Sequence, residues 1–133
     1  MAEKLCELKK KGGGELKETA LWTNSSPTSS FASQTITLLD ITPYKLIKVT
    51  FRVSTSNSNE YYELYTPDQL LNAIYVSPGS GQVSILGFYT GSARFLRFFR
   101  ASSGTSIVFS TGIQMGGSDN NNYLIPIKIS GLK

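Results

Sequence analysis

The chain contains no histidine and almost no cysteine. None of its 133 residues is a histidine, and Cys6 is the single cysteine. Without histidine, the sequence lacks the usual general base at neutral pH, the Ser-His-Asp triad and histidine-based metal sites. One cysteine excludes an internal disulfide and a zinc site built from cysteines. We therefore expect neither a cofactor nor a metal ion.

Carboxylates are also few. The sequence has nine Asp and Glu residues in total, and Glu60 and Glu63 form the only close pair within the central part of the chain. Side chains three positions apart point to opposite faces of an extended strand, so this pair is badly placed for the two-carboxylate chemistry of a glycosidase. The sequence predicts that the chain is not an enzyme.

Long apolar runs are missing as well. No segment approaches the ~20 apolar residues of a membrane span, and the start has no apolar core of a signal peptide. We expect synthesis in the cytoplasm and no membrane partner. The net charge is +4 and the pI is about 9.2. This modest excess of positive charge does not require a nucleic-acid partner.

Two regions of different composition are visible. Residues 1–14 combine lysines and a few apolar side chains with a run of three glycines, whereas residues 15–133 carry the patterned body. Two interpretations of the first region are open, a loose tail or an attachment peptide that docks onto another protein. We predict the attachment peptide, followed by a glycine joint. Its docking side chains would be Leu5, Cys6 and Leu8.

The body alternates apolar and polar residues with the period of β-strands. Residues 44–53 show this most clearly, because Ile47, Val49, Phe51 and Val53 would share one face. Residues 66–72 are the best place for one helical turn, with Thr66 as N-cap. We predict one all-β domain over 15–133, an antiparallel, jelly-roll-like β-sandwich with at most one short helix. The expected strands are 15–23, 34–39, 44–53, 60–65, 82–90, 93–101, 106–110 and a last one from 123, which would close a sheet over the core.

Tyrosines gather in the middle of the sequence. Tyrosine suits recognition surfaces because it is large and stiff and ends in a polar group. The alternatives are half-buried aromatics of a sheet, or a surface that stacks on saccharide or contacts a partner. We predict that four of these tyrosines form a candidate glycan or interface site, namely Tyr61, Tyr62, Tyr65 and Tyr75. Trp22, in contrast, is interpreted as a core residue.

Basic and aromatic residues alternate over 94–100, in the sequence RFLRFFR. Single-strand nucleic-acid binding would need the arginines on one face. Strand parity instead distributes them over both faces, which favours a core strand with snorkelling arginines or an oligomer interface. We predict an oligomer interface here, with Phe95, Arg97 and Phe99 as its candidate residues.

Three segments carry a resemblance to a known group of proteins. Residues 21–36 (LWTNSSPTSSFASQTI), 109–113 (FSTGI) and 123–133 (YLIPIKISGLK) resemble segments of small proteins and C-terminal domains of tailed bacteriophages infecting Gram-positive or gut bacteria. The resemblance spans about residues 15–133. Its motifs are structural, so they assign no site residues to this chain.

The resemblance implies a structural protein of the virion, associated with the tail fibre or baseplate. Such proteins are β-rich, often homotrimeric and often bind host-surface polysaccharide. The expected partners are therefore other virion proteins, further copies of this chain and a host polysaccharide. The alternatives are a head-decoration or head-fibre protein, and a stand-alone carbohydrate-binding module.

Overall fold

The computed structural model describes residues 17–73, 84–89 and 91–133. The predicted attachment peptide, with Leu5, Cys6 and Leu8, and its glycine joint lie outside the described residues. Tyr75 of the tyrosine group lies outside them too.

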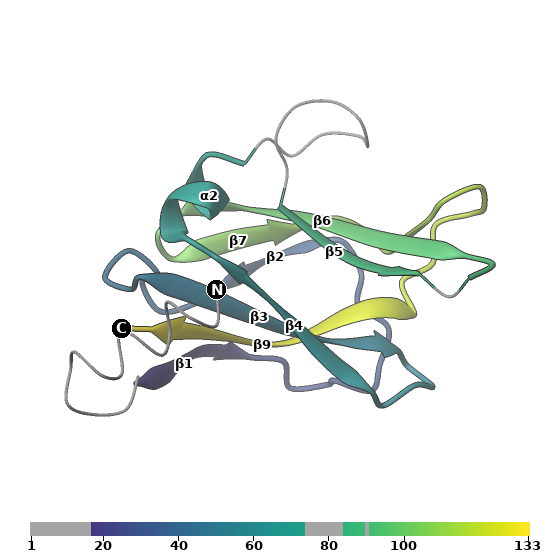
Figure 1. The fold of residues 1–133 in the computed structure, drawn as a ribbon, viewed down its shortest axis with the longest axis horizontal. Helices are drawn as coiled ribbons and strands as arrows, with labels where there is room; N and C mark the ends of the chain where they lie inside the picture. Colours follow the sequence, from purple (N-terminus) through teal and green to yellow (C-terminus); the bar gives the residue numbers. More distant parts are fainter. Residues whose placement is uncertain (1–16, 74–83, 90) are drawn as a thin grey trace.

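Two antiparallel sheets pack face to face (Figure 1). The first has the strand order β1-β9-β3-β4. The second has the order β2-β7-β6-β5, with β8 paired to β6. The prediction of an all-β sandwich with one short helix is confirmed for the described part of the chain. The elements are β1 (Glu18–Thr23), β2 (Gln34–Thr37), β3 (Leu46–Ser54), β4 (Glu60–Tyr65), α2 (Pro67–Leu71), β5 (Ser84–Tyr89), β6 (Arg94–Ser103), β7 (Ser106–Phe109), β8 (Ile113–Gln114) and β9 (Tyr123–Leu132).

The core lies between the inner faces of the two sheets. On β3 the predicted alternation is confirmed, since Ile47, Val49, Phe51 and Val53 are all buried. The second sheet contributes Leu86, Phe99, Ile107 and Phe109 in the same way. These side chains supply the apolar burial that stabilises the sandwich.

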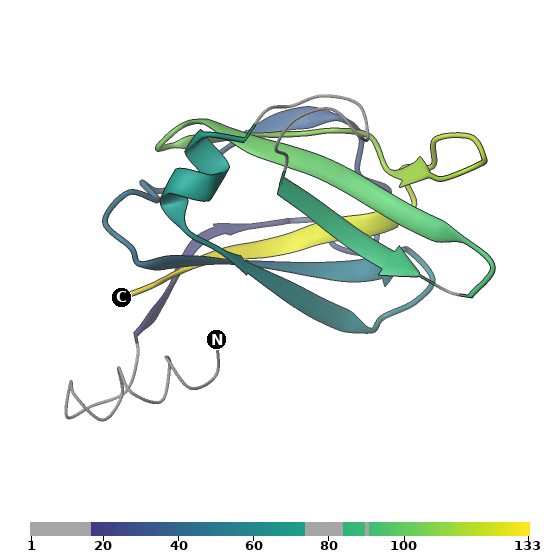
Figure 2. The ribbon, with the colours of Figure 1, turned by 45° about the horizontal axis from the view of Figure 1, so that its top comes forward.

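The short helix α2 follows β4 and leads the chain toward the second sheet. Its N-cap is Thr66, as predicted, and the capping box is complete, because the Gln69 side chain accepts from the Thr66 N–H while the Gln69 N–H donates to Thr66 Oγ1. Leu70 is fully buried and anchors the helix at one end of the sandwich (Figure 2).

Strand β9 occupies the interior of the first sheet. The sequence predicts a last strand from 123, and strict alternation would place Tyr123, Ile125, Ile127 and Ile129 on one face of it. Instead the pairing steps from Thr50–Lys128 to Phe51–Pro126 and skips Ile127. This bulge breaks the alternation, because Ile129 pairs with Val49 whereas Ile125 pairs with Arg52, on the opposite parity of β3. Ile125 and Ile129 are buried, and Tyr123 and Ile127 are half-buried.

The predicted oligomer interface on β6 does not hold. Phe95, Arg97 and Phe99 share one face, as expected, but that face points into the chain's own core. A side chain buried within a single chain has no surface to offer to a partner. The prediction that these three side chains share one face is therefore confirmed, but that face is covered by other residues of the same chain.

The interpretation of this strand as one with snorkelling arginines is wrong for Arg97, which does not reach the surface. It is 0% exposed, and it donates from Nε to Leu124 O (2.8 Å), from Nη1 to Ser110 O (2.6 Å) and from Nη2 to Tyr123 O (2.9 Å). Leu124 has a φ of 52°, in the left-handed region that only few non-glycine residues adopt. Arg97 therefore ties β6 to β7's end and to the strained entry of β9.

Candidate functional site: a groove across strand β5

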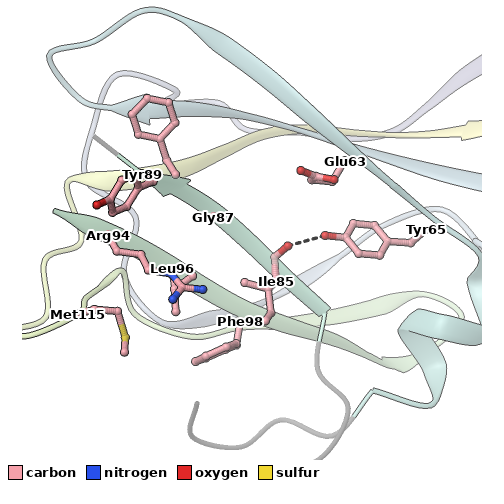
Figure 3. A pocket seen from close by; sticks show the side chains of 10 residues that line it. Glu63, Tyr65, Ile85, Gly87, Tyr89, Arg94, Leu96, Phe98 and Met115 are labelled. Carbon is pink, nitrogen blue, oxygen red and sulfur yellow. Dashed lines mark hydrogen bonds between the residues drawn. The ribbon is translucent and has the colours of Figure 1, made fainter. Parts of the chain in front are cut away.

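An open groove of about 760 Å³ is the candidate site. It lies along the outer edge of the second sheet and is lined from four segments, β4, β5, β6 and the turn after β8 (Figure 3). β4 contributes Glu63 and Tyr65. The other lining residues are Ile85, Gly87, Phe88, Tyr89, Arg94, Leu96, Phe98 and Met115.

Gly87 lies at the middle of β5, where the groove crosses the strand. A Cβ on Gly87 would meet Leu96 Cδ2 at 3.5 Å, which is ordinary van der Waals contact, and its φ lies outside the left-handed region. Neither packing nor backbone conformation therefore requires glycine here. A glycine inside a strand often marks a place where a ligand or another backbone approaches closely.

The neighbouring strand β4 contacts β5 at two points. The rings of Tyr61 and Phe88 lie 5.6 Å apart, and the Tyr65 hydroxyl donates to the carbonyl of Ile85 at 2.6 Å. Glu63 lies across the groove from Gly87 (Figure 3), and along β4 it stands between Tyr61 and Tyr65. Burial raises the pKa of Tyr65, and the charge of Glu63 raises it further, so the hydroxyl stays protonated and remains a donor.

The predicted tyrosine site does not form one patch. Tyr61 pairs with Phe51 and Tyr62 pairs with Thr50, so their side chains leave β4 on opposite faces. Tyr61 is 44% exposed at the groove end, whereas Tyr62 is 56% exposed on the far face, where the Lys48 ammonium lies 4.7 Å from its ring centroid. Tyr65 is half-buried against the core, as the simpler interpretation of these aromatics predicted.

Several groove residues were missed from the sequence. Ile85, Tyr89 and Met115 are exposed large hydrophobic side chains, and Tyr89 is 68% exposed. The alternation of β5 contained a signal for Ile85 and Tyr89, because both share the face opposite to the buried Leu86. Met115 follows β8, and no periodicity predicts where such a loop folds.

The groove is suited to binding. It offers exposed apolar side chains, the carboxylate of Glu63 and the guanidinium of Arg94, which are the kinds of group that line binding clefts. Among the described residues, no group of three or more Cys, Asp or Glu side chains is placed to hold a metal ion.

A second, smaller groove of about 310 Å³ lies near Trp22 and Phe31. The side-chain amide of Asn24, which lines this groove, already makes two hydrogen bonds within the chain. It donates to Pro126 O and accepts from the Ser26 N–H. The Trp22 ring packs edge-on to Phe31 and near Phe109. Trp22 is therefore largely a core residue, as predicted.

Charge on the outer face of the first sheet is concentrated around Glu18. Its carboxylate lies 3.3 Å from Lys48 Nζ and 3.6 Å from Lys128 Nζ. Burial acts to raise the pKa of Glu18, but the hydrogen bond and charge of Lys48, with the charge of Lys128, offset this and hold the pKa below its usual value.

Comparisons with known proteins assign no family to this chain. No family model, no curated protein and no solved structure matches it. Within the part of the chain that the structure describes, no helix has the length and apolar character to cross a membrane.

Proposed function

We propose that this chain is a structural protein of a tailed-phage virion, associated with the tail fibre or baseplate, and that it acts in assembly. The resemblance of residues 21–36, 109–113 and 123–133 supports the setting. One structural observation supports the role: exposed hydrophobic side chains gather around the groove at β5. Such patches mark interaction surfaces on soluble proteins. The gathered side chains are Ile85, Tyr89 and Met115 in the lining, and Tyr61, whose ring lies beside Phe88 of the lining.

In this proposal residues 1–14 attach the chain to another virion protein, and the sandwich contacts neighbouring copies. The resemblance favours a trimer. The alternative of a head-decoration or head-fibre protein involves the same surfaces at another place on the particle.

Host-surface polysaccharide is a second candidate partner. The exposed ring of Tyr89 lies in one groove with Arg94 and Glu63, and an aromatic face beside charged hydrogen-bonding groups is well suited to sugar. A stand-alone carbohydrate module would bind sugar as a monomer and would tolerate loss of residues 1–14.

Quantitative mass spectrometry of gradient-purified particles tests the virion role. Particles from the virus that encodes this chain should contain it in a fixed number of copies per particle, and gold-labelled antibody should mark the tail. Its absence from washed particles would refute the proposal, and label on the capsid would favour the head alternative.

A further inference from the structure

Each sheet of the sandwich ends in two outer strands, and three of these four are protected against pairing with another chain. β1 has a bulge between Ala20 and Trp22, β2 has only four residues, and β4 carries Glu60 and the inward-facing Glu63. Bulges, short length and charge are the usual ways of protecting an edge. The fourth, β5, pairs regularly with β6 over six residues and contains neither a charged residue nor a proline.

The main-chain groups of β5 that point outward follow from the hydrogen bonds of β6. The N–H of Phe98 donates to Ser110 Oγ, its C=O accepts from the Ser110 N–H, and Arg94 O accepts from the Met115 N–H. The even-numbered residues of β6 thus direct their main-chain groups away from β5.

Opposite residues of an antiparallel pair share the same hydrogen-bonding state. Since Ile85, Gly87 and Tyr89 face Phe98, Leu96 and Arg94, their N–H and C=O groups point to the free edge, the side of β5 on which no strand of the described residues pairs. The Tyr65 hydroxyl bound to Ile85 O is direct evidence of this orientation. All three residues are exposed.

We propose that a second copy of this chain pairs with the free edge of β5, antiparallel, about a two-fold axis at Gly87. The two edges fit each other in register, because the outward-pointing residues are 85, 87 and 89. With Gly87 opposite Gly87 of the partner, Ile85 faces the partner's Tyr89, and every outward N–H meets a carbonyl. The Ile85 carbonyl already accepts from the Tyr65 hydroxyl, so its second lone pair receives the N–H of the partner's Tyr89. A closed two-fold contact of this kind uses the same surface twice.

Side chains favour the same register. On the outer face each exposed Tyr89 comes to lie beside Ile85 of the partner subunit, an aromatic–β-branched pair of the kind that stabilises sheets. On the inner face Leu86 and the partner subunit's Phe88 are neighbours. Two strands without charge meet with no ionic repulsion along the edge itself, which is why we choose a second copy rather than a charged peptide as the occupant.

The absence of a side chain at Gly87 provides the test. A Cβ is accommodated there, so Gly87→Lys and Gly87→Glu should both fold. The proposed axis places two like charges directly opposite each other in either variant. Each should weaken the dimer at least about tenfold, because like charges held against each other across an interface are strongly unfavourable. Mixing the two variants places a lysine opposite a glutamate and should restore the dimer. Thr35→Lys is the matched control, because Thr35 is exposed on β2, at the other edge of the same sheet.

The experiment is sedimentation equilibrium on the full chain up to about 0.5 mM. The wild type and Thr35→Lys should approach twice the 14.5 kDa of one chain, each glycine variant should stay monomeric, and their equimolar mixture should dimerise. Circular dichroism confirms that each variant folds. A wild-type monomer or trimer, a dimer that survives Gly87→Lys, or a mixture that stays monomeric would each overturn the proposal. The inference rests on the proposed assembly role for its setting, and it replaces the trimer that the resemblance favours with a two-fold dimer. The assembly role and the dimer fail separately, since particle content is measured independently.

Discussion

Replacing Arg97 by methionine should destabilise the chain strongly. Methionine keeps most of the buried volume but donates no hydrogen bond, so three carbonyls lose their donors. Hydrogen bonds to a charged group contribute about 1.5 kcal/mol or more each. About 1–2 kcal/mol of that sum is offset, because methionine does not need to be desolvated as a buried charge. We expect a net loss of about 3 kcal/mol.

That loss is a large fraction of the ~5–15 kcal/mol that stabilises a typical domain. With a urea m-value of roughly 1.5 kcal/mol/M, the unfolding midpoint should fall by about 2 M. The fluorescence of Trp22 is a suitable probe, because Trp22 contacts Phe31, whose ring centroid lies 5.2 Å from Arg97 Cζ. Far-UV circular dichroism should report the same transition if unfolding is two-state.

Two further variants make the reasoning refutable. Arg97→Lys keeps the charge but cannot reach three carbonyls from one ammonium, so it should lose nearly as much stability as Arg97→Met. Arg94→Met changes an exposed arginine on the same strand and should alter the free energy of unfolding by less than about 0.5 kcal/mol. A midpoint for Arg97→Met within about 0.5 M of the wild type would show that the buried hydrogen bonds contribute little.

Three other variants test separate features. Glu18→Gln should lower the free energy of unfolding by a few tenths of a kcal/mol at pH 7 and low salt, since the Glu18 side chain is 35% exposed beside Lys48. Because the pKa of Glu18 is lowered in the folded chain, this stabilisation is present above pH ~4.5 and disappears as the pH falls below that value. Urea titrations of both chains at pH 7 and pH 3 would check this. Glu63→Gln should tighten the dimer several-fold in low salt, and sedimentation in 0.5 M salt should abolish the difference, because the two Glu63 carboxylates lie on the same side of the paired strands. Gly131→Ala should lower stability by about 1–3 kcal/mol in thermal melts, because its Cβ would overlap the Tyr44 ring, and Tyr44→Ala in the same chain should remove most of that cost.

Local patterns predicted the elements well. The alternation of β3 identified its buried face, and the Thr66-Pro67-Asp68 sequence located the start of α2. Such features depend only on residues a few positions apart.

Tertiary pairing decided what the sequence could not. Parity grouped Phe95, Arg97 and Phe99 on one face, but a charged residue in the group suggested the surface. Arg97 is buried because carbonyls 13 to 27 positions away, two of them at the turned entry of β9, are arranged around it. The same applies to the groove, which joins β4, β5 and Met115. No sequence period connects these segments, so only the packed sandwich shows that they lie together.

The position of β9 between β1 and β3 has a consequence for how the protein is made. The hydrogen bond from Asn24 to Pro126 spans 102 positions, and β1 pairs with no strand other than β9 among the described residues. A ribosome therefore exposes β1 and β3 long before the strand that joins them emerges. Domains with such distant pairings fold slowly, in milliseconds to seconds. A chain interrupted before β9 would lack an interior strand of the first sheet. Both β1 and β3 would then expose unpaired edges, which chaperones can bind and which can pair with other chains in aggregates.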